Sequence, residues 1–160
     1  MRARPAVRAV VDSNILVRGL LRRRPNSAAV RVIDAAIDGA FELVLSPYLL
    51  GEVAETLREP EVRALRGLTA AQVDALVAAL ARVGHVVKGA YEVDLVSRDA
   101  DDNPVVACAL EGGAGFVVTD DRRHLLLLKA VRVAGHRVVQ LVSPVAFLRQ
   151  HLLAGERGRP

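Results

Sequence analysis

Several residue types are scarce in this sequence, and each scarcity excludes a class of protein. There is one cysteine, Cys108, which excludes an internal disulfide framework and a zinc site built from cysteines alone. There is no tryptophan, and three phenylalanines and two tyrosines are too few for the aromatic pattern with which RRM-type modules stack RNA bases. No uncharged run approaches the ~20 apolar residues of a membrane span, so we expect no membrane association.

The length and composition predict one folded domain. The chain has 160 residues, of which 52% are hydrophobic and 25% charged, as is typical of globular proteins. We expect a single domain over residues 1–154 and a flexible tail over 155–160. The basic residues 1–5 precede an apolar stretch that Asp12 makes too short for a secretion signal. Together with the single cysteine, this favours a cytoplasmic protein.

The basic charge comes almost entirely from arginine. The net charge is +4, with 20 arginines and two lysines, Lys88 and Lys129. A planar guanidinium binds phosphate with two parallel hydrogen bonds, so this composition is compatible with a polyanionic partner. An ordinary solvated surface that uses arginine in place of lysine is the alternative interpretation, and charge does not decide between the two.

Short apolar runs alternate with amphipathic stretches along the chain. The runs that we expect to be strands cover residues 6–11, 41–45, 85–87, 115–119 and 138–141. Near-continuous apolar strands that alternate with helices are typical of a parallel sheet covered on both faces. Ligands of such sheets bind outside the carboxyl ends of the strands, where the strand order reverses.

Acidic residues gather where two of these strands end and before one helix. Asp12 follows the first expected strand, and Asp120 and Asp121 follow the fourth. A third group precedes the helix that Pro104 begins and consists of Asp99, Asp101, Asp102 and Asn103. Helix capping is the alternative role for each of these acids, but four acceptors exceed what one helix N-terminus needs.

The helix expected over residues 47–58 carries a further acid. Its apolar face leaves Glu52 on the flank, where the side chain could reach the edge of the sheet, while Glu55 and Glu59 are interpreted as a solvated face. Carboxylates that converge on one place repel one another unless a hard cation with oxygen ligands lies between them. The pattern therefore indicates Mg²⁺ or Mn²⁺.

Four segments carry these residues in a fixed order: Val10–Asn14, Ser46–Val53, Asp102–Ala109 and Val118–Asp121. Together they resemble the four motifs of the PIN domain, a family of metal-dependent ribonucleases, and the similarity covers about residues 7–148. The run over 98–103 is most similar to the VapC-like toxins of toxin–antitoxin systems. The resemblance implies a three-layer α/β/α sandwich with a five-stranded parallel sheet of order 3-2-1-4-5.

The resemblance also assigns the site. It implies that the catalytic, metal-binding acids are Asp12, Glu52, Asp102 and Asp121. Ser13, Asn14, Asp99, Asp101 and Asp120 would surround them. The family often has glycine where this chain has Asp120, so Asp120 and Asp121 compete for the fourth position. One or two Mg²⁺ or Mn²⁺ ions would support hydrolysis of an RNA phosphodiester bond, in the role of a type II toxin.

Partners follow from the same reasoning. Two basic clusters that follow elements near the expected site are candidates for RNA binding, with a solvated surface as the alternative: Arg22, Arg23 and Arg24, and Arg122 and Arg123. The four leucines of 125–128 exceed what one helix face buries, which suggests contact with a second copy in a homodimer or with a cognate antitoxin. A non-catalytic PIN-like module that binds RNA or protein is the alternative function.

Overall fold

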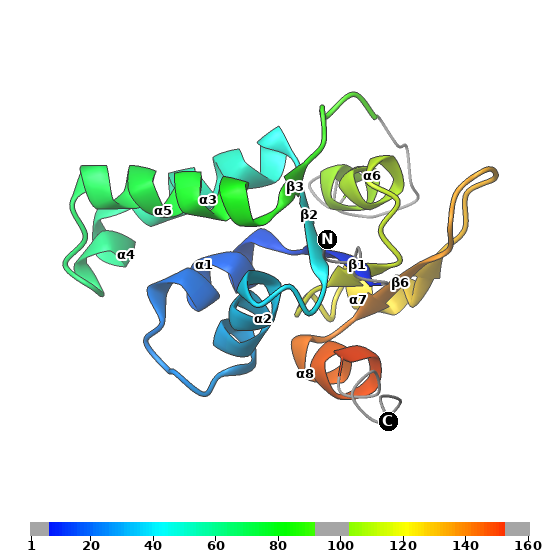
Figure 1. Cartoon of the computed structure of the whole chain (residues 1–160), viewed down its shortest axis with the longest axis horizontal. Coiled ribbons are helices and arrows are strands. Elements are labelled where there is room, and N and C mark those ends of the chain that lie inside the picture. The colour runs from blue at the N-terminus through cyan, green and yellow to red at the C-terminus, as the bar shows by residue number, and fades with distance from the viewer. Residues whose placement is uncertain (1–6, 92–102, 153–160) are drawn as a thin grey trace.

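A computed structural model describes residues 7–91 and 103–152 (Figure 1). The elements are β1 (Arg8–Val11), α1 (Ser13–Leu21), α2 (Ala28–Ile37), β2 (Glu42–Leu45), α3 (Pro47–Arg58), α4 (Pro60–Ala64), α5 (Ala70–Val83), β3 (His85–Val86), α6 (Asn103–Glu111), β4 (Phe116–Val118), α7 (Leu125–Leu128), β5 (Ala130–Val131), β6 (Val139–Val142), α8 (Pro144–Ala146) and the π-helix η2 (Phe147–Leu152). The expected tail and the acids Asp99, Asp101 and Asp102 lie outside the described residues.

The strands form one sheet in the order β3-β2-β1-β4-β6-β5. Every pair is parallel except β5 and β6. The five expected strands therefore occur in the predicted order. The prediction of five strands is wrong by one, because β5 adds an antiparallel strand at the edge, pairing Ala130 with Gln140. This strand has two residues, too few for a period-two pattern to identify it.

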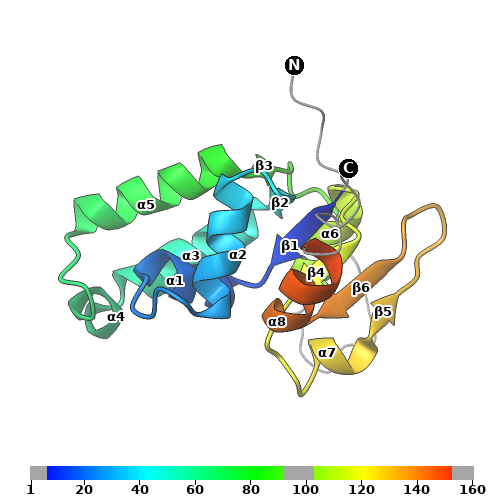
Figure 2. The same cartoon turned by 60° about the horizontal axis from the view of Figure 1, so that its bottom comes forward.

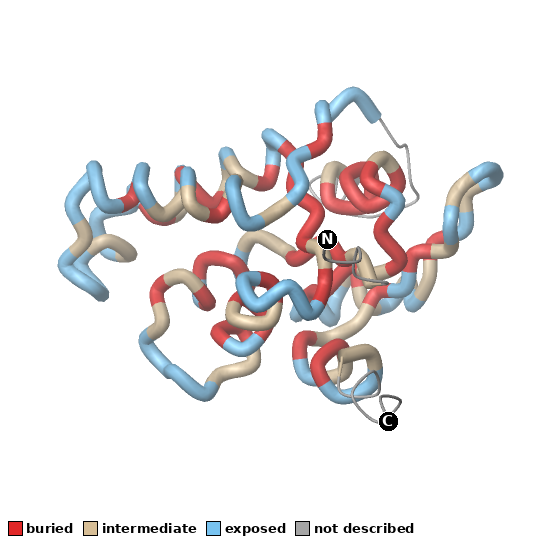
Figure 3. Tube along the Cα trace, viewed as in Figure 1, coloured by how far each residue is buried: buried red, intermediate tan, exposed pale blue. Residues whose placement is uncertain are grey.

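Alternate residues of the central strands point into two separate cores, as the pleat requires. Ala9 and Val11 pack on the side of α1, α2 and η2, whereas Val10 and Val117 pack on the side of α6. These helices lie on opposite sides of the sheet, and the buried residues concentrate between the layers (Figures 1 and 3). The predicted three-layer sandwich is confirmed.

Helices α3 and α5 lie side by side with α4 at their far end (Figures 1 and 2). The signals that begin these helices are those that the sequence carries. Ser46 accepts a hydrogen bond from the Leu49 N–H, and Pro47 occupies the first turn. Thr69 and Gln72 form a reciprocal capping box at the start of α5.

Two details of the C-terminal half bear on the sequence interpretation. The helix expected to run from Pro144 to about residue 153 is instead α8 followed by η2, in which Phe147 packs edge-on against Phe41 with ring centroids 5.0 Å apart. Burial raises the pKa of the Cys108 thiol to about 12, consistent with a packing role.

Within the described ranges, no helix combines the length and apolar character needed to cross a bilayer.

Gly51 weakens α3 and provides a first prediction. It is exposed, and a Cβ added to it would meet no atom within 4 Å. Gly51→Ala should therefore raise the free energy of unfolding by about 1 kcal/mol, measured by urea denaturation. Gly39→Ala is the matched control, because Gly39 has φ +75° with equally open surroundings and the alanine should destabilise by roughly 1 kcal/mol. Destabilisation by Gly51→Ala would contradict this assignment of α3.

Candidate functional site

The site lies where β1 and β4 end side by side. The parallel register pairs Val11 with Val118, so the chain leaves both strands at the same edge of the sheet. The Asp12 N–H donates to the Val118 carbonyl oxygen at 2.9 Å, which extends the pairing by one residue. Asp12 and Thr119 consequently emerge next to each other, at the position where the strand order reverses.

Asp12 occupies the N-cap position of α1, but its side chain makes no capping hydrogen bond to that helix. Its Oδ2 instead accepts from the Thr119 hydroxyl at 2.9 Å. Burial raises the pKa of Asp12, and the charges of Asp121 and Asp120 raise it further, whereas hydrogen bonds from Thr119 and the Ser13 N–H oppose the shift. Side-chain capping of the second or third N–H of α1, the alternative role that the sequence left open for Asp12, is therefore not what its carboxylate does here.

Thr119 joins the two acidic strand ends, and the sequence analysis did not identify it. It is 0% exposed, its hydroxyl donates to Asp12, and its oxygen accepts from the Asp121 N–H at 3.0 Å. A hydroxyl satisfied on both sides fixes the carboxylate and the following turn together. The signal in the sequence was a polar residue placed directly after a buried strand and before two acids.

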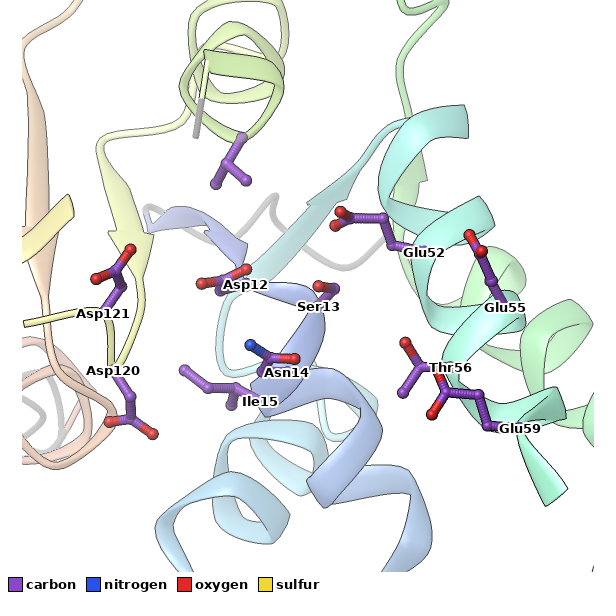
Figure 4. Close-up of a pocket in the computed structure, with 11 residues that line it drawn as sticks. Asp12, Ser13, Asn14, Ile15, Glu52, Glu55, Thr56, Glu59, Asp120 and Asp121 are labelled. Atoms are coloured by element: carbon purple, nitrogen blue, oxygen red, sulfur yellow. The ribbon is translucent and has the colours of Figure 1, made fainter. Parts of the chain in front are cut away.

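The neighbouring acids Asp120 and Asp121 have different surroundings. Asp121 Oδ1 accepts from the backbone N–H groups of Arg123 at 3.1 Å and His124 at 3.0 Å, and its Oδ2 lies 3.5 Å from His124 Nδ1. Asp120 forms an ion pair with Arg18 of α1. The Asp121 carboxylate lies toward Asp12, whereas that of Asp120 points away from it (Figure 4).

Helix α3 supplies the opposite wall. Its residues Leu49, Val53 and Leu57 are buried, which orients the helix so that Glu52 lies at its edge. The Glu52 carboxylate points toward the centre of the pocket (Figure 4). Glu55 and Glu59, interpreted from the sequence as a solvated face, are exposed, and they also line the pocket.

The pocket has a volume of about 490 Å³. It is lined by Asp12, Ser13, Asn14, Ile15, Glu52, Glu55, Thr56, Glu59, Val105, Asp120 and Asp121. The structure thus brings together in one pocket all the expected acids that it describes. Within the described part of the chain, however, no three His, Cys, Asp or Glu side chains form a group tight enough to hold a metal ion.

The expected RNA-binding arginines fall into two groups. Arg22 follows the C-terminal end of α1 and pairs with Asp34 at 2.5 Å, and Arg23 and Arg24 are exposed in the adjoining loop. Arg22 follows Ile15, the last residue of α1 that lines the pocket, by seven positions, roughly 10 Å along the helix at about 1.5 Å per residue. Arg122 and Arg123 are exposed directly after Asp121, next to the pocket.

Asp12 provides a second prediction. Because folding raises its pKa, its contribution to stability is lost as the pH rises through the folded pKa, and the ionised carboxylate destabilises the fold at neutral pH. In EDTA at pH 7, Asp12→Asn should raise the free energy of unfolding by on the order of 1 kcal/mol. The gain should shrink below the ordinary aspartate range, where the wild-type carboxyl is protonated. An Asp12→Asn variant that is less stable than the wild type at pH 7 would show that the ionised Asp12 carboxylate does not destabilise the fold.

Thr119 provides a third prediction. Thr119→Val removes the acceptor of the partly buried Asp121 N–H and the donor to Asp12, and these two losses together should cost about 2–3 kcal/mol in unfolding free energy. Thr119→Ser keeps both hydrogen bonds and loses one methyl group, about 1 kcal/mol. Urea denaturation of both variants checks this, and a valine variant as stable as the serine variant would show that the hydroxyl does not hold the site.

Comparison with known proteins identifies the family of this chain. A family model described as the PIN domain matches residues 8–123. No curated protein sequence matches the chain. One similar solved structure is a chain of "VapBC2 from Rickettsia felis bound to a DNA fragment from their promoter", at 9% identity and TM-score 0.50, covering 73% of this chain and 90% of that one.

A second is a chain of "FitAB bound to IR36 DNA fragment", at 16% identity and TM-score 0.47, covering 85% of this chain and 94% of that one. At these identities the structural similarity concerns the fold alone. The family match spans most of the chain and includes Asp12, Glu52, Asp102 and Asp121. The chain therefore belongs to the PIN domain family.

Proposed function

We propose that this protein is a Mg²⁺- or Mn²⁺-dependent endoribonuclease that hydrolyses RNA phosphodiester bonds. The observation that carries the proposal is the convergence of Asp12, Glu52 and Asp121 on one pocket from three separate places in the chain: the residue after β1, helix α3 and the loop after β4. Asp102, which lies outside the described residues, completes the proposed set. It precedes α6 in the sequence, and Val105 of that helix lines the pocket.

The residues of the pocket suit a hard divalent cation. Their acidic side chains offer carboxylate oxygens, the ligands that Mg²⁺ and Mn²⁺ prefer. Burial and two neighbouring carboxylates raise the pKa of Asp12, so its ionised form lacks compensating positive charge. A cation at this position would provide that charge and favour the ionised form.

One or two ions held by Asp12, Glu52, Asp102 and Asp121 would supply electrostatic stabilisation of the charge that develops on the phosphodiester during hydrolysis. The protein holds the acids in place. Thr119 fixes Asp12, and the backbone N–H groups of Arg123 and His124 fix Asp121. Ser13, Asn14, Asp99 and Asp101 are the proposed polar neighbours, and Asn14 and Ser13 line the pocket.

The substrate is an anion and the pocket is acidic, so the RNA backbone needs basic residues around the site. Arg122 and Arg123 are proposed to bind it close to the pocket, since they directly follow Asp121. Arg22, Arg23 and Arg24 are proposed to bind the RNA backbone further from the cleavage site, beyond the other end of α1. Phosphate contacts of this kind position the substrate without reading its sequence.

The biological role that we propose is the toxin of a type II toxin–antitoxin system, acting in the cytoplasm. The support is the VapC-like run of acids in the sequence and the family match. A cognate antitoxin and a second copy of the chain are the proposed protein partners. The leucines of α7 are one candidate contact, because the Leu127 side chain is 69% exposed.

Cleavage of a fluorescently labelled structured RNA tests the catalytic proposal. The wild type should cleave with Mg²⁺ or Mn²⁺ and not with EDTA. Asp12→Asn, Glu52→Gln, Asp102→Asn and Asp121→Asn should each lower the rate by at least about 100-fold, because each removes an ionised ligand.

Glu61→Gln is the control for these substitutions, because Glu61 is an exposed acid of α4 that does not line the pocket, and it should keep the wild-type rate. Undiminished cleavage by Asp12→Asn would reject the assignment. RNA or protein binding without any metal-dependent cleavage would favour the alternative, a non-catalytic PIN-like binding module.

A further inference from the structure

The described residues that line the pocket include six carboxylates and no lysine or arginine. An RNA backbone that enters such a pocket must cross a negative field before its phosphates reach the acids. Basic side chains in contact with the lining residues are therefore best placed to bind the neighbouring phosphates.

Arg18 is such a side chain. It lies one helical turn after Asn14 on α1, and its Nε donates to the Asn14 carbonyl oxygen at 3.4 Å. Its Nη2 forms an ion pair with Asp120. Asn14 and Asp120 both line the pocket, so two lining residues hold the guanidinium at its rim.

Other arginines in the described part of the chain form their ion pairs away from the pocket. Arg8 binds Glu42 and the Gly112 carbonyl oxygen, Arg22 pairs with Asp34, and Arg58 pairs with Asp74. None of these carboxylates lines the pocket. Arg18 differs from them because its partner, Asp120, lines the pocket.

The ion pair also separates the roles of the two adjacent acids. The carboxylate of Asp120 is compensated by Arg18 and points away from Asp12, whereas that of Asp121 lies toward Asp12 and is held by backbone N–H groups (Figure 4). A carboxylate already paired with a guanidinium is a poor candidate for a metal ligand, because binding a cation would bring it toward a second positive charge.

We propose, on the basis of the function above, that Arg18 binds an RNA phosphate beside the scissile bond and that Asp120 is its positioning residue and not a metal ligand. A guanidinium has five N–H donors, more than its contacts with Asp120 and Asn14 require, so it can bind a phosphate oxygen while both contacts persist. The Arg18 side chain is 55% exposed, which gives the backbone access to it.

Substitution of Arg18 tests the proposal. Arg18→Ala should raise KM for the labelled RNA by roughly 3- to 10-fold, the range of an exposed charge-assisted contact, with kcat within about twofold of wild type. Arg18→Lys keeps the charge and should recover part of the loss. Arg58→Ala is the matched control, because Arg58 is 57% exposed and forms an ion pair of similar type away from the lining residues, and it should leave KM unchanged.

Binding without cleavage gives a second readout. In EDTA, fluorescence anisotropy of a short labelled RNA should show weaker binding by Arg18→Ala, with the slope of log K against log salt concentration reduced by roughly 0.7, the value for one phosphate contact on a single strand. A merely structural role would lower the melting temperature and leave that slope unchanged.

Asp120→Asn tests the division of roles. Because it removes the ion pair that holds Arg18, it should raise KM in the same direction as Arg18→Ala, with a fall in kcat far smaller than the loss of at least about 100-fold expected for Asp121→Asn. Wild-type KM and an unchanged salt slope in Arg18→Ala, or loss of cleavage in Asp120→Asn equal to that in Asp121→Asn, would overturn the proposal. If the wild type binds RNA through Arg18 but cleaves none, the ribonuclease proposal fails while the role of Arg18 in binding stands.

Discussion

The parallel pairing of β1 with β4 is the constraint on which the rest of the site depends. These strands are far apart in the sequence, and their register places the residues after Val11 and Val118 at the same edge of the sheet. Thr119 then reaches Asp12, and its backbone neighbour Asp121 turns toward the same pocket. A register shift of one residue would reverse every side chain of the strand and remove Thr119 from Asp12.

The acids gathered at this edge repel one another, and the fold compensates their charges to different extents. Arg18 compensates Asp120, and two backbone N–H groups stabilise Asp121. Asp12 is partly buried and faces both neighbouring charges, and these effects raise the pKa of its carboxyl group. Placing destabilising charge where a ligand would relieve it is typical of functional sites, and it separates this pocket from a surface optimised for stability alone.

The sequence predicts much of this arrangement, and its failures share a cause. The strand ends locate Asp12 and Asp121, and the helical period of α3 locates Glu52, because these depend on local pattern. The roles of Thr119 and Arg18 depend on contacts between distant segments, and Arg18 and Asp120 lie 102 positions apart. Glu55 and Glu59 are exposed, as the helical period predicts, but that they also line the pocket depends on the packing of α3 beside α1.

The central claim is that Asp12, Glu52 and Asp121, together with Asp102, bind one or two divalent cations in this pocket. The most direct test is an anomalous difference map from crystals of the protein soaked in Mn²⁺. We expect a peak with an Asp12 oxygen at about 2.0–2.2 Å, the range for small hard divalent cations, and with Glu52 or Asp121 as a further ligand. A peak bound by Asp120 or by Glu55 and Glu59 without Asp12, or no peak in the pocket at all, would contradict this claim.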